Sequence, residues 1–258
     1  MARYRLKVAY DGTEFHGWQK QAPTHGAYLR TVQEDLERAI RDVVRQPVVV
    51  QGASRTDTGV HANGQIAVFD AETDLEPYRM LCALNSKAPS DIRILEVDIV
   101  ANTFNPIADC TSKGYRYCLA HGCKDPRRKP LFDRRYVANT AYNLDVVAMQ
   151  EACTFLIGEH DFAAFTKLNH GRESTVRRIG TCNVTETEPW RITIDVSGNG
   201  FLWNMVRIVV GTLLDVGRGK TNADEIPEII LSKDRTRAGA TMPPEGLSLE
   251  WIRYEDGQ

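Results

Sequence analysis

The pattern of apolar residues starts twice along this chain, and this repetition is the strongest constraint on its fold. Residues 4–10 alternate apolar and polar side chains with the period of a half-buried strand, which the turn residues Asp11-Gly12 end. Apolar residues then recur at helical spacing over 31–44, behind a capping box formed by Thr31 and Glu34. The chain is therefore predicted to begin with a strand followed by a helix.

The same order returns after residue 106. Residues 115–119 alternate like the first strand, and residues 144–157 predict a helix that Gly158 ends. Asn105-Pro106 interrupts the periodicity between the two starts, without a flexible linker. We expect two similar halves, residues 1–106 and 107–258.

Short strands fill most of the remaining chain. Because strands outnumber helices and the connections are too short for a doubly wound sheet, the expected fold class is α+β. The segments 182–187 and 191–196 flank Glu188-Pro189 and are predicted to pair as antiparallel strands. The further strands are expected at 48–50, 65–69, 95–99, 182–187 and 191–196, and a last helix at 201–216.

Composition and charge limit the possible classes of protein. The chain has 258 residues, 42% of them hydrophobic and 26% charged, which is typical of a water-soluble globular protein. The first seven residues hold no uninterrupted apolar segment, so no secretory signal is expected, and a cytoplasmic or organelle-matrix location is predicted, of which we take the cytoplasm. The six cysteines form no C-x-x-C pair, which favours reduced structural thiols. With a net charge of −2, affinity for nucleic acid would have to come from local clusters of Lys and Arg.

A segment of small residues between two expected strands carries the strongest chemical signal. Residues 52–62 set Arg55, Asp57 and His61 among glycine, alanine, serine and threonine. Small residues let a bulky substrate approach the backbone, and Gly59 permits a conformation that other residues disfavour. The segment is predicted to be a site loop, and the alternative is a tight surface turn with a solvated ion pair.

Asp57-Thr58-Gly59 also matches the signature triplet of aspartic proteases. Those enzymes need two carboxylates that share one proton, whereas the chain has a single Asp-Thr-Gly. Arg55 would also hold Asp57 ionised, because a neighbouring cation favours the charged form. A protease would therefore require two copies of the chain.

Residues 201–214 are apolar nearly all round, which predicts a buried core helix that is too short and too charged to span a membrane. Arg207 is the exception, because burial of an unpaired guanidinium costs roughly several kcal/mol. Asp215 lies about 12 Å further along the helix axis and cannot be its partner in one straight helix. We predict that Arg207 pairs with Asp57; the alternatives are another acid or an Arg207 side chain that extends to the helix end.

Aromatic and basic residues supply the other candidate contacts. Tyr115 and Tyr117 lie on one face of their strand, where either could contact a nucleobase or pack in the core. Two basic stretches could follow a phosphate backbone, and the alternative for each is a solvated charged face. They comprise Lys124, Arg127, Arg128, Lys129, Arg134 and Arg135, and then Lys167, His170, Arg172, Arg177 and Arg178.

Seven short motifs follow one another in order along the chain, at residues 10–13, 17–19, 32–33, 55–62, 115–117, 158–162 and 205–211. Together they resemble the TruA family of tRNA pseudouridine synthases, from Tyr10 to about Leu249. The chain departs from the family pattern at two places. Ser54 replaces a usual glycine, and Phe104-Asn105-Pro106-Ile107 stands where many members read Phe-His-Ala-Arg.

The resemblance implies a ferredoxin-like α+β repeat in two halves, each with helices on one face of its sheet and with a catalytic cleft between them. It implies that Asp57 is the catalytic carboxylate, that Arg207 is its basic partner and that Tyr115 contacts the base. It also implies a homodimer whose tRNA lies across both subunits, with targets at positions 38–40 of the anticodon stem-loop. Neither a metal nor an organic cofactor is implied.

The residue types suit that chemistry. Isomerisation of uridine breaks the C1′–N1 bond and forms a C1′–C5 bond, so a carboxylate could attack C1′ or remove a C2′ proton. The target nucleotide must leave its helix, and Arg55 could fill the space or hold the phosphate. The expected RNA contacts are Lys167, Arg177, Arg178, Arg127 and Arg128. A non-catalytic tRNA-binding protein or RNA chaperone of the same fold is the alternative, which the intact Asp57, Tyr115 and Arg207 disfavour.

Overall fold

The computed structural model describes residues 1–21, 29–167 and 174–255. It divides into two compact units, Met1–Thr111 with Ser248–Gln258, and Ser112–Leu247. These units differ from the predicted halves because the chain returns to the first unit for its last strand. The domains 1–106 and 107–258 stay a prediction.

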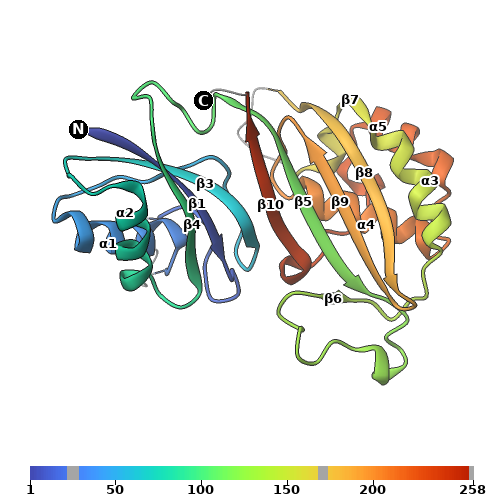
Figure 1. Cartoon of the computed structure of the whole chain (residues 1–258). Helices are drawn as coiled ribbons and strands as arrows, with labels where there is room; N and C mark the ends of the chain where they lie inside the picture. The colour runs from blue at the N-terminus through green and yellow to red at the C-terminus, as the bar shows by residue number, and fades with distance from the viewer. Residues whose placement is uncertain (22–28, 168–173, 256–258) are drawn as a thin grey trace. The chain divides into compact units, whose positions relative to one another are not determined.

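The first unit contains a six-element repeat in the order strand, helix, strand, strand, helix, strand (Figure 1). Its strands β1, β3 and β4 pair antiparallel with β1 in the centre, and β2 pairs with the other side of β3. This strand order, β4-β1-β3-β2, is that of the ferredoxin-like fold. The elements are β1 (Ala2–Tyr10), α1 (Val32–Val44), β2 (Gln51–Gly52), β3 (His61–Ala71), α2 (Pro77–Lys87) and β4 (Ile92–Val100).

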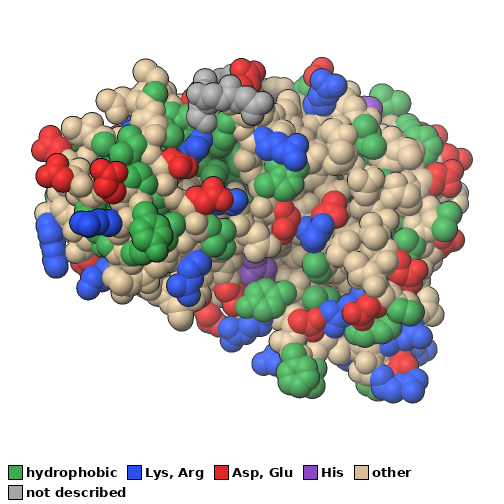
Figure 2. Space-filling model, viewed as in Figure 1, with side chains coloured by type: hydrophobic (Ala, Val, Ile, Leu, Met, Phe, Trp, Pro, Cys, Tyr) green, Lys and Arg blue, Asp and Glu red, His purple; other side chains and the backbone are tan. Residues whose placement is uncertain are grey.

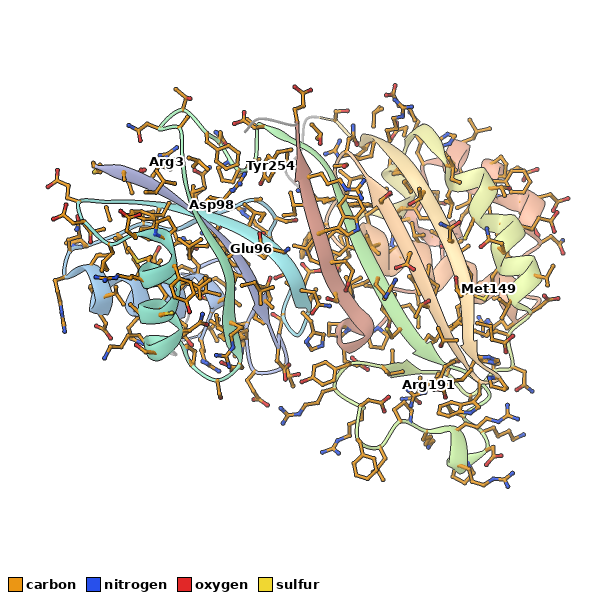
Figure 3. The ribbon with its side chains drawn as sticks, in the orientation of Figure 1. Arg3, Glu96, Asp98, Met149, Arg191 and Tyr254 are labelled. Atoms are coloured by element: carbon orange, nitrogen blue, oxygen red, sulfur yellow. The ribbon has the colours of Figure 1, made fainter. Side chains whose placement is uncertain are left out.

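The alternation along β1 explains why helices cover one face of this sheet. Tyr4, Leu6 and Val8 are buried, together with the apolar stripe of α1. The alternate residues form a ladder of cross-strand ion pairs, Arg3 with Asp70, Arg5 with Asp98 and Lys7 with Glu96, and each pair is in register. Figure 3 labels Arg3, Asp98 and Glu96 along this polar face.

The second unit repeats the order of the first. Strands β5, β9, β8 and β7 pair antiparallel in that order, so β5, β9 and β8 correspond to β1, β3 and β2. Helices α3 and α4 take the places of α1 and α2, which confirms the predicted two similar halves. The elements are β5 (Cys110–Ala120), β6 (Ala138–Asn139), α3 (Val146–Leu156), β7 (Gly158–Asp161), β8 (Val176–Glu188), β9 (Arg191–Gly198), α4 (Met205–Gly217) and α5 (Ile226–Ser232).

The second sheet also has one apolar and one polar face. Tyr117 and Leu119 of β5 and Ile194 of β9 are fully buried, and α4 lies in the core with α3 beside it. On the opposite face, Arg116 pairs with Asp195 directly across the β5–β9 ladder. Helices therefore cover a single face of each sheet, as predicted.

The last strand, β10 (Leu247–Tyr254), runs parallel to β3. Ser248 lies opposite His61 and Leu249 opposite Ala62, so the end of the chain borders the strand that follows the Asp57 loop. A methyl group on Gly64 would lie 2.4 Å from the Glu250 carbonyl, and glycine is needed there for the two backbones to approach.

Several local predictions were wrong. Residues 48–50 are not a strand, because pairing with β3 begins only at Gln51. Thr31 precedes α1 but its side chain makes no capping bond, so the predicted capping box is absent. Helix α4 begins at Met205 instead of 201, since Asn204 has a left-handed backbone with φ 60°. It is not the last helix, and α2, α5 and β10 were not predicted.

Candidate active site

The Asp57 loop forms a hydrogen-bonded turn in the first unit. The backbone N–H of Val60 donates to the carbonyl of Asp57 at 3.1 Å, and Gly59 has φ 78°. A four-residue turn with positive φ at its third residue is of type II, which requires glycine there. Asp57 occupies the first position of the turn and is half-exposed.

Residues that are distant in the sequence fix the backbone of this loop. The carbonyl of Thr56 accepts a hydrogen bond from the Trp18 N–H at 3.0 Å, and the Thr56 hydroxyl bonds the Tyr10 hydroxyl at 2.8 Å. Gly59 donates its N–H to Phe15. Thr56 is buried. The residue next to Asp57 is therefore held by both its backbone and its side chain.

Two glycines let the 10–19 segment approach the loop. A methyl group on Gly12 would lie 2.0 Å from the Val60 carbonyl, and one on Gly17 would lie 2.8 Å from the Thr56 carbonyl. Gly17 also has φ 92°. The motifs at 10–13, 17–19 and 55–62 are thus parts of one tightly packed structure.

Gln33 joins a further motif to the same structure. Its N–H donates to the Trp18 carbonyl, and its side-chain oxygen accepts from Gln19 and from the Lys20 N–H. Its side-chain nitrogen donates to Val50. Because Gln33 is buried and fully engaged, it orients the segment that supports the Asp57 loop.

His61, the third charged or titratable residue of the predicted site loop, is buried and makes structural contacts. It is buried, and its Nδ1 accepts the Gly12 N–H at 2.9 Å and lies 3.3 Å from Asp11. Of the three charged or titratable residues predicted in the loop, Arg55 is exposed and Asp57 half-exposed. His61 closes the loop onto the end of β1.

The second unit carries Tyr115 and Arg207. Tyr115 is buried on the apolar face of β5 and meets Phe201 edge-on, with ring centroids 5.2 Å apart. Arg207 lies on the first turn of α4 and donates to the Asn204 side chain at 2.8 Å. Phe201 and Asn204 were not predicted as site residues, although both lie in the segment just before the helix.

A strap of residues 238–243 holds Arg207 in place. The Arg207 Nε donates to the Met242 carbonyl at 2.6 Å, and the Met242 N–H donates to the Arg207 carbonyl at 3.2 Å. The hydroxyl of Tyr117 donates to the next carbonyl, Pro243, at 2.8 Å. Burial raises the pKa of Tyr117, and the nearby Arg207 opposes this shift.

The strap lies against α4 because glycines meet there. A methyl group on Gly211 would lie 1.9 Å from the Ala240 carbonyl, and the Gly239 N–H donates to the Thr212 hydroxyl at 2.9 Å. Asp215, on the last turn of α4, pairs with Arg218 and Lys220, whereas Arg207 lies on the first turn of the same helix. Asp215 is therefore not the partner of Arg207, as predicted.

Asp57 belongs to the first unit, and Tyr115 and Arg207 belong to the second. The Asp57–Arg207 ion pair and the cleft between the halves therefore stay predictions. Each unit by itself presents its candidate on a well-packed support, a turn for Asp57 and a strap for Arg207.

The predicted RNA-contacting residues lie on the second unit in two places. Lys167 is exposed with its ammonium 4.8 Å from the Trp203 ring centroid, and Arg178 is exposed on β8 beside the half-buried Arg177. Arg127 is exposed but pairs with Asp125, and Arg128 donates to Asn143. His170 and Arg172 lie outside the described residues.

The two departures from the family pattern have local explanations. Ser54 is half-buried and exchanges two backbone hydrogen bonds with the Gln65 side chain, without a positive φ. Phe104 is buried against Tyr254, and the Asn105 side chain accepts the N–H groups of Ile107 and Ala108. Residues 104–107 thus form an asparagine-organised turn that the missing His and Arg would not make.

Comparison with known proteins identifies the family. A model of the tRNA pseudouridine synthase family matches residues 7–106 and 152–255. The chain belongs to this family. It is 41% identical to tRNA pseudouridine synthase A 2 of Clostridium perfringens and 42% identical to tRNA pseudouridine synthase A of Acetivibrio thermocellus, in each case over 98% of this chain and all of the relative. The corresponding enzyme of Listeria monocytogenes is 38% identical over 99% of the chain and all of its own length.

No helix within the described ranges is long and apolar enough to cross a membrane. All six cysteines are free thiols, as predicted.

Proposed function

We propose that this chain converts uridine to pseudouridine in tRNA and that Asp57 is its catalytic carboxylate. The identity of about 41% to tRNA pseudouridine synthases over nearly the whole chain carries this proposal. Asp57 supports it locally, because the turn that bears it is fixed by contacts from the motifs at 10–13 and 17–19, and Gln33 of a third motif supports the second of these. Such support is what a reacting group needs in order to stay within the productive geometry.

The reaction needs one carboxylate and no net redox change. The C1′–N1 bond breaks, the uracil turns, and a C1′–C5 bond forms. The C5 proton then leaves to solvent while N1 ends with a proton. The carboxylate of Asp57 would either attack C1′ or remove a proton from C2′. We propose that neither a metal nor an organic cofactor takes part, and that the group lies in a cleft between the two halves.

Release of tritium from [5-³H]uridine-labelled tRNA tests the role of Asp57. Asp57→Ala and Asp57→Asn should lower the rate on the order of 10⁴-fold or more, as removal of a covalent catalyst does in other enzymes. Asp42→Asn, on the exposed side of α1, is the matched control and should keep the wild-type rate. Tritium release by Asp57→Ala at the wild-type rate would exclude this assignment.

Arg207 is proposed to hold the Asp57 carboxylate ionised and oriented. Its guanidinium is already positioned by Met242 and Asn204, so it would reach Asp57 without ordering a flexible side chain. Arg207→Ala should lower the free energy of unfolding by about 3 kcal/mol, since it breaks this network and leaves a carboxylate unpaired. It should also lower the rate of tritium release.

Arg207→Lys separates the two effects. Lysine keeps the charge but loses the planar fork that bonds Met242 and Asn204, so the free energy of unfolding should fall while part of the activity remains. If Arg207→Ala left both stability and turnover unchanged, Arg207 would have no place in the site.

The remaining residues are proposed to contact the RNA. Tyr115 would stack on the detached uracil and prevent its escape, and Arg55 would hold the everted nucleotide or its phosphate. Lys167, Arg177, Arg178, Arg127 and Arg128 would contact the tRNA backbone. Tyr115→Ala should lower turnover more than binding, whereas Arg55→Ala should weaken binding of tRNA.

The finer assignments follow the family. We propose that the targets are positions 38–40 of the anticodon stem-loop, and that the enzyme works as a homodimer in the cytoplasm. Mapping of pseudouridines in tRNA treated with the protein tests the first assignment, and sedimentation equilibrium tests the second. A wild-type chain that binds tRNA without tritium release would instead indicate the non-catalytic tRNA-binding protein.

A further inference from the structure

A projecting segment of the second unit, residues 121–143, has a charge opposite to that of the rest of the chain. We call this segment the basic lobe. It holds six Lys and Arg residues and two Asp residues, a charge of +4, whereas the whole chain carries −2. The remainder of the chain therefore carries −6. In Figure 1 the lobe extends past the ends of β5, β9 and β8, and Figure 2 shows Lys, Arg and apolar side chains gathered on it.

The base of the lobe is firmly attached to the second sheet. Strand β6 pairs parallel with the end of β5, and Val137 and Cys123 form a small apolar core with Ala120. Backbone hydrogen bonds also join the two sides of the lobe, from Gly122 to Tyr142 and from Cys123 to Thr140. The lobe is thus held as an ordered structure and not as a loose loop.

An ion pair fixes Asp133, the residue that follows Phe132 in the lobe. Asp133 pairs with Arg191 of β9, which Figure 3 labels where the lobe joins the strands. Arg191 lowers the pKa of Asp133 by hydrogen bonding to it. The carbonyl of Asp133 also accepts the N–H groups of Tyr136 and Val137, at 2.8 and 3.1 Å. The backbone around residue 133 is therefore constrained from two directions.

Phe132 projects from this constrained backbone into solvent. Its side chain is 95% exposed, and its neighbours Leu131 and Tyr136 are exposed as well. A phenylalanine with this exposure contributes nothing to the core, so packing does not explain it. Lys129, Arg134 and Arg135 surround it in the sequence and are exposed too. An aromatic side chain among cations is the arrangement that binds single-stranded nucleic acid.

The lobe lies in the part of the chain that the family model leaves unmatched, residues 107–151. We propose that Phe132 of the basic lobe stacks on an unpaired base of the substrate tRNA while Lys129, Arg134 and Arg135 contact the adjacent phosphates, in addition to the backbone contacts proposed for Arg127 and Arg128. This inference rests on the proposed function, because it takes tRNA as the ligand.

Charge decides between RNA and a protein partner. A cluster of +4 favours a polyanion, whose association releases counterions, and the nearly complete exposure of Phe132 suits a flat ring that stacks on a base. The stacking partner must be an unstacked base, since the faces of a base inside a helix are covered by its neighbours. Loops of tRNA provide such bases.

Equilibrium binding of fluorescently labelled tRNA tests the stacking contact without requiring turnover. Phe132→Ala should weaken binding by about 5- to 150-fold, which is the usual range for loss of one base–aromatic stack. Tyr78→Ala is the matched control, because Tyr78 is 76% exposed on α2 of the first unit. Binding of a fully paired RNA duplex should be equal for Phe132→Ala and wild type. If Phe132→Ala and Tyr78→Ala bind tRNA equally well, the stacking contact is excluded.

The salt dependence of binding tests the phosphate contacts. Arg134→Gln with Arg135→Gln should reduce the slope of log K against log salt concentration by about 1.4 to 1.8, for two lost contacts. The double variant Arg41→Gln with Arg79→Gln removes two exposed arginines from the first unit and should leave the slope unchanged. Equal slopes for the two double variants would overturn this part of the proposal.

Turnover and oligomeric state complete the test. Lobe variants should raise KM for tRNA and keep kcat, since the lobe takes no part in the chemical step. Absence of tritium release by the wild type would contradict the proposed function. The comparisons of tRNA affinity and of salt dependence would still test whether the lobe binds RNA. If Phe132→Ala dissociated a dimer in sedimentation and left tRNA affinity per chain unchanged, the lobe would be an interface between copies and our proposal would fail.

Discussion

Single residues in this chain owe their roles to close backbone contacts more than to their own chemistry. Gly12 and Gly17 let the 10–19 segment reach the Asp57 loop, and Gly211 lets the strap reach α4. In each case a methyl group would lie within 2.8 Å of a carbonyl oxygen, a distance at which the backbone must shift. Motifs that look like separate short signals therefore mark places where two segments touch.

His121 is the residue for which the structure predicts a pH effect. It is buried at the base of the basic lobe, and neither ring nitrogen has a hydrogen-bond partner in the described part of the chain. Burial lowers the pKa of His121 from its usual 6.5, because charge is disfavoured away from water. Below pH of about 6.5 the unfolded chain binds a proton at this residue that the folded chain does not bind, so the native state loses stability as pH falls further.

Urea denaturation at pH 7.5 and pH 5.5 would check this effect. His121→Gln should reduce the loss of unfolding free energy between the two pH values, by at most about 1.4 kcal/mol for each pH unit over which only the unfolded chain is protonated. His16→Gln, at an exposed position, is the control and should reproduce the wild-type difference. Identical pH differences in all three proteins would show that His121 does not contribute.

At the scale of elements, both sheets separate an apolar face from a face of cross-strand charges. The apolar face supplies most of the stability, because its side chains leave water entirely. The alternation of the two faces fixes the register, and in this register each cation of β1 lies opposite an acid. A shift by one residue would bring the charged side chains of β1 to the core.

The difference in energy between the two faces can be measured. Leu6→Ala, on the apolar face of β1, should lower the free energy of unfolding by about 2 to 5 kcal/mol. The adjacent pair Lys7 and Glu96, 2.7 Å apart, should show a coupling of only about 0.2 to 1 kcal/mol in a double-mutant cycle with alanine. That coupling should fall in high salt, because both side chains are exposed. A Lys7–Glu96 coupling as large as the effect of Leu6→Ala would contradict this assignment.

At the scale of the whole molecule, strand β10 belongs to the first unit, where it pairs with β3, although it follows the second unit in the sequence. Leu249 is fully buried in β10 and lies opposite Ala62 of β3, although the two residues are 187 positions apart in the sequence. Such long-range pairings are slow to form, because a long loop of chain must be closed before they contribute. Strand β3, which follows the Asp57 loop, therefore depends at Ala62 on a segment that is distant in the sequence.

Leu249→Ala tests this dependence. The lost burial should lower the free energy of unfolding by about 2 to 5 kcal/mol, a large part of the stability of an ordinary domain. Leu231→Ala, 78% exposed on α5, removes the same atoms from the surface and should change it by less than about 0.5 kcal/mol. Urea midpoints compare the two variants. Equal midpoints would mean that β10 does not stabilise the first unit.

The sequence by itself determined the strands and helices whose periodicity is strong. The strand at residues 4–10, the helix at 31–44 and their counterparts at 115–119 and 144–157 were predicted, as was the antiparallel pair around Glu188-Pro189. Helix α2 escaped prediction because it buries little more than Met80 and Leu84, and β10 because its pairing partner lies far away. Asp57 could be singled out because its motif is local.

Only the tertiary structure decided which segments support that aspartate. Contacts between Gly12 and Val60 and between Trp18 and Thr56 depend on distances across the first unit, which local spacing does not encode. The exposure of Phe132 is of the same kind, since an apolar residue in a sequence is expected inside unless the fold leaves it in water. Periodicity therefore set the elements, and packing between distant segments set the site.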